Sequence, residues 1–277
     1  MRALKTVFDF YINSSIHVAL AVVAMTCVTY FEFDISVDIN LLCFIGFASI
    51  TGYNFVKYFG LAKFHHRSLS NTLKAIQVFS LLCFLSMCYF VLQVSVNALV
   101  AILIFGSITF LYAIPLLPNR FFVDQKKKLR SISGLKIYII ALVWSGVTVG
   151  LPLINESFEF NNDVLISAVQ RFIFVIIIML PFEIRDLNYD SLKLATIPQR
   201  IGVKSTKIAG LILSFVLVSL EYFKDDINTG HLFSLCVIVF MTLVLLMFST
   251  QQQGKYYCAF WVESIPVWWM ILLLMFR

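Results

Sequence analysis

Three carboxylates lie within eight residues in the segment FEIRDLNYDSLKLATIPQRIG, residues 182–202. On a helix, Asp186 and Asp190 share one face, and Glu183 lies one turn before Asp186 on that face. Carboxylates that crowd one face repel each other, and a divalent cation offsets the repulsion. Mg²⁺ is usually held by one or two carboxylates together with substrate phosphates and water. The segment therefore predicts a magnesium site formed by Asp186 and Asp190, with Glu183 as a further candidate ligand.

A solvated helix end is the alternative interpretation of the same acids. Arg185 and Lys193 lie close by in the sequence and could form salt bridges with them. The continuation LATIPQRIG favours a built site, because Thr196, Pro198 and Gly202 indicate an ordered turn before the next apolar segment. On spacing alone, both interpretations remain open.

The chain that positions these residues is unusually apolar. Of its 277 residues, 60% are hydrophobic and 13% are charged, against about half and a quarter in a soluble domain. A membrane-spanning helix needs about 20 mostly apolar residues. Nine segments qualify, and they leave no room for a soluble domain: 8–30, 39–60, 73–93, 96–117, 135–154, 163–182, 204–222, 230–249 and 256–276. We therefore predict an all-α, polytopic membrane protein with nine transmembrane helices, in which residues 1–277 form a single domain.

The distribution of charge predicts the orientation of the chain. If the N-terminus is cytoplasmic, the 21 Lys and Arg residues fall on the cytoplasmic side, apart from Arg171, Lys224 and Arg277. By the positive-inside rule, this places the N-terminus in the cytoplasm and the C-terminus on the opposite side of the cell (inner) membrane. The net charge of +6 is then a topology signal, and no nucleic-acid partner is expected.

Ionisable residues inside predicted spans are functional candidates by default. Arg171 lies near the outer end of its span, about two turns after Asp163, so we expect it to extend to the water interface. For His17 and Glu263, inside the first and last spans, we expect hydrogen bonds within the helical bundle.

The stretch IRDLNYDSLKLATIPQRIG resembles the second aspartate motif of the UbiA-type intramembrane prenyltransferases. The matching residues are Asp186, Asp190, Thr196, Pro198, Arg200 and Gly202. A second stretch, FLYAIPLLPNR at 110–120, is similar to the YSxPPxR motif of that family, with Tyr112, Pro115 and Arg120 at matching positions. Nine spans and a cytoplasmic N-terminus also fit. The resemblance implies a UbiA-like helical bundle with a central cavity.

The resemblance also implies a reaction. Two aspartate motifs face each other across the cavity and bind a prenyl diphosphate through Mg²⁺, with Asp186 and Asp190 as the catalytic pair here. The allylic C–O bond ionises, and a lipophilic acceptor of aromatic or quinone type captures the carbocation. Because bond breaking builds negative charge on the diphosphate, cations in a dry site stabilise the transition state. Arg120, Lys136 and Arg200 are candidates for that role, and Tyr112 is a further substrate-binding candidate. The implied partners are these two substrates and the lipid bilayer; the sequence does not tell whether a protein partner exists.

The first aspartate motif of the family, NDxxDxxxD, is not kept. The aligned stretch NFVKYFGLA begins at Asn54 and places Phe55, Tyr58 and Ala62 at the three aspartate positions. Lys57 adds a positive charge instead. Since loss of one preorganised electrostatic contact commonly costs about 10²–10³ in rate, ordinary two-motif catalysis is not expected. We predict that Asn54 and Lys57 contact the substrate; the alternative for Lys57 is a side chain that extends to water.

Three functions are compatible with this pattern. The first is a divergent prenyltransferase with one magnesium site, in which Lys57 and Lys63 contact the diphosphate directly. The second is a catalytically silent protein of the same fold that binds a lipophilic molecule. The third is a small transporter, which is least favoured because Gly/Pro-broken spans in matching halves are not evident.

Overall fold

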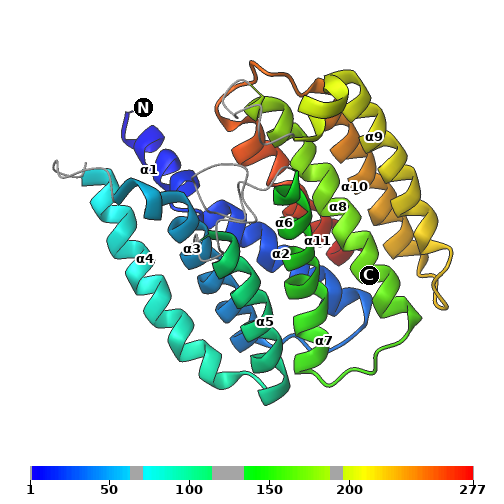
Figure 1. The fold of residues 1–277 in the computed structure, drawn as a ribbon. Helices are drawn as coiled ribbons and strands as arrows, with labels where there is room; N and C mark the ends of the chain where they lie inside the picture. Colours follow the sequence, from blue (N-terminus) through cyan, green and yellow to red (C-terminus); the bar gives the residue numbers. More distant parts are fainter. Residues whose placement is uncertain (1, 63–70, 114–133, 188–195, 277) are drawn as a thin grey trace, which may run out of the picture.

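A computed structural model shows the chain as a bundle of helices (Figure 1). The structure describes residues 2–62, 71–113, 134–187 and 196–276. Within these ranges every regular element is a helix, so the predicted all-α class is confirmed.

The helices follow the predicted apolar segments in order. Their bounds are α1 Arg2–Asn13, α2 Ile16–Glu32, α3 Ile39–Ala62, α4 Asn71–Phe90, α5 Val96–Ala113, α6 Leu135–Ser145, α7 Leu151–Asn155, α8 Asn162–Asp186, α9 Ile197–Glu221, α10 Thr229–Phe248 and α11 Ile265–Phe276. Three short turns complete them: the 3₁₀ turn η1 (Val91–Gln93) and the π-helical turns η4 (Gly146–Gly150) and η6 (Tyr257–Val262). The turn η4 joins α6 to α7 in one apolar rod, and η6 leads towards α11.

The described helices confirm a multi-pass membrane protein. Seven helical segments are long and apolar enough to cross a membrane, and α1 with α2 makes an eighth if the 57° bend between them lies within one span. Helix α5 contributes a shorter apolar stretch, Val96–Leu111. The number nine therefore stays a prediction.

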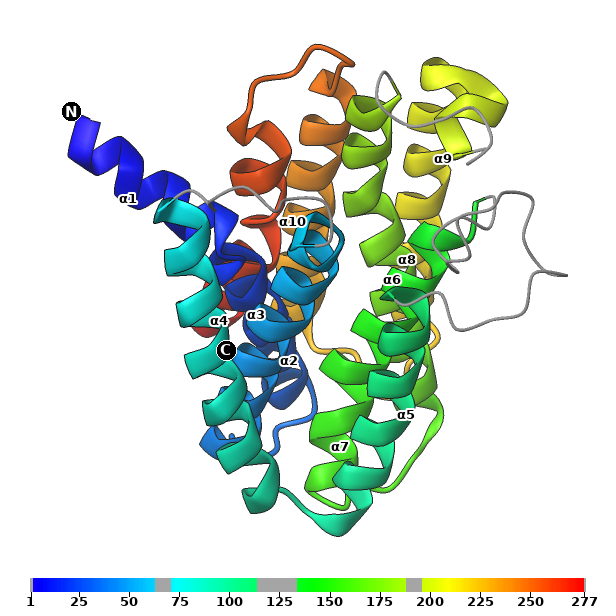
Figure 2. The same ribbon diagram turned by 60° about the vertical axis from the view of Figure 1, so that its left-hand side comes forward.

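Helix α8 forms the centre of the bundle. Its apolar residues Phe174–Ile178 and Leu180 are buried, and it packs against α6, α9 and α10. A helix that is apolar on all sides is stable only when neighbours surround it. Helices α4 and α9 lie at opposite edges of the bundle in both views (Figures 1 and 2). They expose large apolar side chains, such as Leu82 and Phe215, as expected of helices that face lipid.

The bundle has two ends that differ in chemistry. At one end, which we name the site end, α3, α5 and α8 finish and α4, α6 and α9 begin. At the other, the far end, α2, α4, α7 and α9 finish and α3, α5, α8 and α10 begin. Glu183 and Asp186, the described acids of the segment that motivates the magnesium prediction, belong to the site end.

Candidate functional site

Asp186, the last residue of α8, lies between two cations. Its Oδ1 accepts a hydrogen bond from Nε of Arg185 at 2.7 Å, and its Oδ2 lies 3.8 Å from Nζ of Lys136, in the first turn of α6. All three side chains are partly exposed, at 21%, 32% and 22% respectively. The residue predicted to hold a metal therefore joins the end of α8 to the start of α6 through ion pairs.

Glu183 has a different environment one turn earlier. It is only 2% exposed, and its Oε2 accepts the backbone N–H of Ile197, the first residue of α9, at 3.1 Å. The first N–H groups of a helix have no partner within the helix and need an acceptor elsewhere. Glu183 thus connects the end of α8 to the start of α9. The sequence analysis missed this role, although the Thr196–Gln199 capping pattern marks the same helix start.

The ordered turn predicted from LATIPQRIG is present. Pro198 lies in the first turn of α9, where its missing N–H costs nothing, and the N–H of Thr196 donates to Oε1 of Gln199 at 3.0 Å. Gly202 has φ 79°, which interrupts the helix just after this turn. Helix α9 therefore begins seven residues before the apolar span predicted at 204–222, because the capping residues, not hydropathy, set its start.

Asn54 is buried inside the bundle. Its Oδ1 accepts from Oγ of Ser15 at 2.8 Å, and its Nδ2 donates to the carbonyl of Ser14 at 2.9 Å and to Oγ of Ser80 at 2.8 Å. These bonds connect the break between α1 and α2 to α3 and α4. The predicted contact between Asn54 and substrate stays a prediction.

The break between α1 and α2 is also held by His17. One ring nitrogen of His17 is 2.7 Å from the hydroxyl of Tyr11, and the other is 3.0 Å from the carbonyl oxygen of Phe260. The predicted hydrogen-bonded structural histidine is confirmed.

Lys57 brings a further positive charge to the site end. Its Nζ donates to the carbonyl of Asn13 at 3.2 Å, and its side chain is exposed. Glu263 lies at the junction between η6 and α11. The hydrogen bond within the bundle that the sequence suggested for the Glu263 side chain stays a prediction.

The other predicted site residues are less closely defined. Arg200 lies exposed in the first turn of α9. Asp190, Arg120 and Lys63 lie outside the described residues, as does the side chain of Tyr112. The predicted residues that the structure brings together are thus Lys136 and Asp186.

The described donors do not fit a magnesium site. Among the residues that the structure describes, no group of three or more His, Cys, Asp or Glu side chains could hold a metal ion. Glu183 is engaged with the start of α9, and Asp186 has Arg185 and Lys136 beside it. These two cations disfavour a third positive charge at the same carboxylate. The magnesium predicted from the sequence stays a prediction that depends on Asp190.

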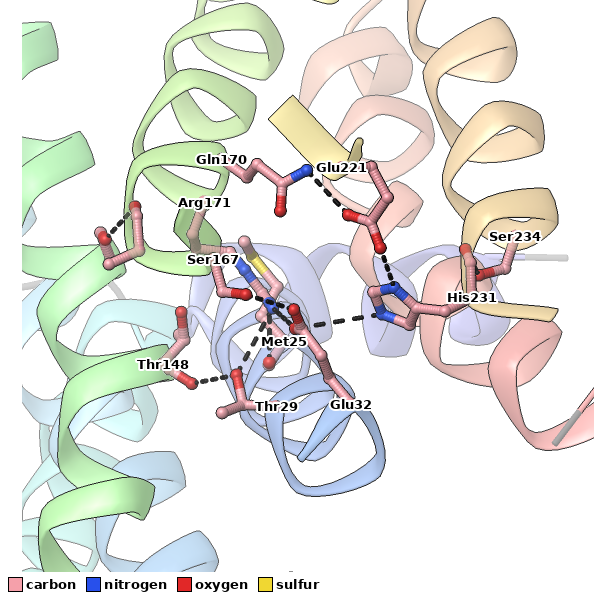
Figure 3. Close-up of polar contacts among 12 residues, drawn as sticks. Met25, Thr29, Glu32, Thr148, Ser167, Gln170, Arg171, Glu221, His231 and Ser234 are labelled. Atoms are coloured by element: carbon pink, nitrogen blue, oxygen red, sulfur yellow. Dashed lines mark hydrogen bonds and ion pairs between the residues drawn. The ribbon is translucent and has the colours of Figure 1, made fainter. Parts of the chain in front are cut away.

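A second charged cluster lies at the far end (Figure 3). We name Glu32, Arg171, Glu221, Lys224 and His231 the far-end network. Nζ of Lys224 donates to Glu32 at 2.7 Å and to Glu221 at 2.8 Å. Nη2 of Arg171 lies 3.7 Å from Glu32, and Nδ1 of His231 lies 3.1 Å from Glu221. These contacts connect α2, α8, α9, the loop after α9 and α10.

The prediction for Arg171 was wrong. The residue is only 1% exposed and does not extend to the water interface. Its Nη1 donates to the carbonyl of Met25 at 2.7 Å, and its guanidinium lies 4.8 Å from the ring centroid of Trp269. The nearby Asp163 instead accepts the backbone N–H of Asp225. Arg171 finds its counter-ion, Glu32, on another helix, which spacing within its own span cannot reveal.

The far-end network balances its own charge. Two carboxylates, Glu32 and Glu221, face two cations, Arg171 and Lys224, and His231 completes the cluster. Burial alone lowers the pKa of Lys224, but the carboxylates of Glu32 and Glu221 outweigh burial and raise that pKa above its ordinary value. A cluster that is neutral and hydrogen-bonded needs no ligand to compensate its burial. We therefore interpret it as a structural connection between helices and place the functional site at the other end.

The comparisons with known proteins agree with this architecture. No protein-family model matches the sequence, and no curated protein matches it. Among solved structures, a digeranylgeranylglyceryl phosphate synthase in membranes matches with a TM-score of 0.56 and 15% sequence identity, covering 100% of this chain and 98% of that chain. Identity this low shows the fold alone. Over its whole length, the chain has the fold of a UbiA-type membrane prenyltransferase.

Proposed function

We propose that this protein binds a prenyl diphosphate at the site end and transfers the prenyl group to a lipophilic acceptor of aromatic or quinone type. One observation carries the proposal: cations from three helices, Lys57 of α3, Lys136 of α6 and Arg185 of α8, belong to the same end of a prenyltransferase-like bundle. This is the end at which Asp186 finishes α8.

The proposed reaction needs positive charge where the diphosphate leaves. The allylic C–O bond breaks and its electron pair goes to the diphosphate, while a bond forms between the prenyl carbon and the acceptor, which loses a proton. Preorganised cations in a site shielded from water stabilise such developing charge. We assign this role to Lys57, Lys136 and Arg185, with Arg200, Arg120, Asn54 and Tyr112 as further predicted contributors. Magnesium at Asp186 and Asp190 is a further prediction, and no step here depends on it.

A silent binder is the second candidate function. Phe55 and Tyr58 occupy positions where the resemblance calls for aspartates, and neither carries charge at neutral pH. A protein with that substitution could hold a prenyl diphosphate without turning it over.

Binding followed by turnover separates these candidates. Detergent-purified protein is titrated with radiolabelled geranylgeranyl diphosphate, with farnesyl and geranyl diphosphates as shorter probes, and challenged with inorganic diphosphate. We expect saturable binding that inorganic diphosphate displaces. Release of inorganic diphosphate on addition of a membrane quinone and lipid extract supports a transferase, whereas binding without release supports the silent binder. Absence of saturable binding to all three prenyl diphosphates contradicts both.

A further inference from the structure

The first helix, α1, does not run straight into the membrane span that follows it. The axes of α1 and α2 differ by 57°, and the bend falls at Ser15, whose φ of 62° lies in the left-handed region. Asn54 of α3 holds this break, because its side chain bonds to the hydroxyl of Ser15 and to the carbonyl of Ser14. The hydroxyl of Tyr58 donates to the carbonyl of Asn13, the last residue of α1, at 2.8 Å. The bend is therefore fixed by contacts with a neighbouring helix.

Helix α1 has an apolar stripe and a polar face. Leu4, Val7, Phe8 and Tyr11 follow the spacing i, i+3, i+4, i+7, which places them on one side of the helix. Leu4 is 78% exposed and Val7 is 66% exposed, and Lys5, at the border of the stripe, is exposed as well. Amphipathic helices with cations on the polar face lie in the plane of the membrane interface, with the apolar face about 5–10 Å deep at the boundary between headgroups and acyl chains.

Contacts with the start of the last span fix the position of α1. Asp9 accepts hydrogen bonds from Nζ of Lys255 and from the hydroxyl of Tyr256, the latter at 2.7 Å. The ring of Phe8 packs edge-on against the rings of Tyr256 and Phe260, with centroid distances of 5.1 and 5.3 Å. Helix α1 therefore has a defined place at the site end, where it projects from the bundle (Figures 1 and 2).

An open groove lies between α1 and Tyr256. Its volume is about 620 Å³, and it is lined by the four residues of the apolar stripe together with Lys5 and Tyr256. Lys5 is the one charged residue among the described residues that line it. A hydrocarbon chain suits such a wall, because burial of apolar surface is favourable. A phosphate group suits the lysine, because a charged donor and a charged acceptor form strong hydrogen bonds.

We propose that α1 lies in the membrane interface and binds an anionic phospholipid, with an acyl chain along the groove and the phosphate group at Lys5. Charge complementarity carries the choice of lipid. The two segments that border the groove, 2–13 and 255–256, contain Arg2, Lys5 and Lys255 against the single carboxylate of Asp9. A neutral phospholipid offers the same chains without this attraction. The inference is independent of the proposed function, because it concerns the bilayer and not the diphosphate.

This assignment changes where the first span begins. Hydropathy predicted a span at 8–30, whereas α2 starts at Ile16 and has 17 residues, at the short end of the range that crosses a bilayer. The apolar residues between Phe8 and Ile12 then belong to the interface and not to the span. Helix α2 alone makes the first crossing.

The test compares two photoreactive phospholipids on the full chain. Purified protein is reconstituted in phosphatidylcholine vesicles that contain a small fraction of phosphatidylglycerol or phosphatidylcholine with a diazirine in the acyl chain, and the labelled peptides are mapped. The comparison on wild type requires no variant. Lys5→Gln removes the charge at the groove, and Val7→Gln makes its wall polar. Lys74→Gln is the matched control, since Lys74 is exposed near the start of α4 at the same end of the bundle.

We expect phosphatidylglycerol to label the peptides of residues 4–11 and of Tyr256 about fivefold more than phosphatidylcholine, as for the attraction of one lysine to an anionic headgroup. Lys5→Gln lowers labelling by phosphatidylglycerol to the level of phosphatidylcholine, whereas Lys74→Gln leaves the ratio unchanged. Val7→Gln lowers labelling by both lipids. Thermal unfolding confirms that each variant is folded.

Two results on wild type overturn the proposal. Equal labelling of α1 by the two lipids shows that the groove has no preference for negative charge. Absence of label from α1 with both lipids shows that the bilayer does not contact the helix, as when a protein partner covers the apolar stripe. A ratio that a folded Lys5→Gln protein leaves unchanged contradicts the assignment of the phosphate to Lys5.

Discussion

Neighbouring acids of one helix turn have separate roles in this protein. Glu183 is buried and accepts a backbone N–H of α9, whereas Asp186 is partly exposed and pairs with Arg185 and Lys136. Their spacing predicted a shared helix face, and α8 does continue through Asp186. Spacing could not predict that Glu183 accepts a hydrogen bond from the start of α9, because that contact depends on where the chain places α9 relative to α8.

Replacement of Glu183 tests whether it is a structural acceptor or a ligand. In Glu183→Ala the N–H of Ile197 loses its acceptor, and we expect a loss of about 1–2 kcal/mol in stability, as for other helix caps. Affinity for geranylgeranyl diphosphate stays within about twofold. Glu159→Ala, at an exposed position, is the control in both thermal unfolding and binding. A folded Glu183→Ala protein that no longer binds the diphosphate would show that Glu183 is a ligand.

The contribution of Lys224 to the stability of the folded protein is expected to depend on pH. Burial lowers the pKa of Lys224, but the nearby carboxylates of Glu32 and Glu221 raise it by more, so the pKa in the folded protein is above its ordinary value. A group whose pKa rises on folding stabilises the protein fully below its unfolded value, near 10.4, and loses this contribution as pH rises through the higher folded value. We expect Lys224→Met to have a lower melting temperature than wild type at pH 8, with the gap closing above about pH 10.5. A gap that stays constant up to pH 12 would contradict the assignment.

At the scale of elements, hydropathy located the helices but not their interruptions. Each predicted apolar segment falls on a described helix, because the bilayer demands about 20 apolar residues whatever their order. The π-helical turns η4 and η6 and the break at Ser14–Ser15 were not predicted. Uniformly apolar spans carry no periodicity that would reveal such breaks. They are set by contacts between helices, such as those of Asn54 with Ser14 and Ser15.

Within helix α9, Gly202 occupies a backbone conformation that favours glycine. Its φ of 79° is in the left-handed region, and an added Cβ would meet nothing within 4 Å, so the expected cost is conformational and not steric. We expect Gly202→Ala to lose about 1–2 kcal/mol of stability, measured as a lower melting temperature. Gly254→Ala is the matched control, since that position is also open and is not among the positive-φ glycines. Equal melting temperatures for the two variants would show that α9 relaxes without cost at the kink.

At the scale of the whole molecule, we assign a structural role to the far end of the bundle and the proposed function to the site end. The far-end network is internally balanced and connects four helices, whereas at the site end Arg185 and Lys136 lie beside the partly exposed carboxylate of Asp186. The resemblance to UbiA-type prenyltransferases predicted the fold, which the solved structure confirms at 15% identity. The sequence also singled out Lys136 and Asp186, which the structure brings together, although their role with a substrate stays a prediction. The sequence could not identify Glu32 as the counter-ion of Arg171, because 139 positions separate the two and only the folded bundle brings their side chains together.

The central claim is that a prenyl diphosphate binds at the site end. The most direct test is photolabelling of the purified protein with a prenyl diphosphate analogue that carries a photoreactive group next to the diphosphate, followed by peptide mapping. We predict labels on peptides around Lys57, Arg185 and Glu263 that excess geranylgeranyl diphosphate suppresses. Suppressible labels confined to the peptides of Glu32, Glu221 and His231 would place the ligand at the far end and contradict the account.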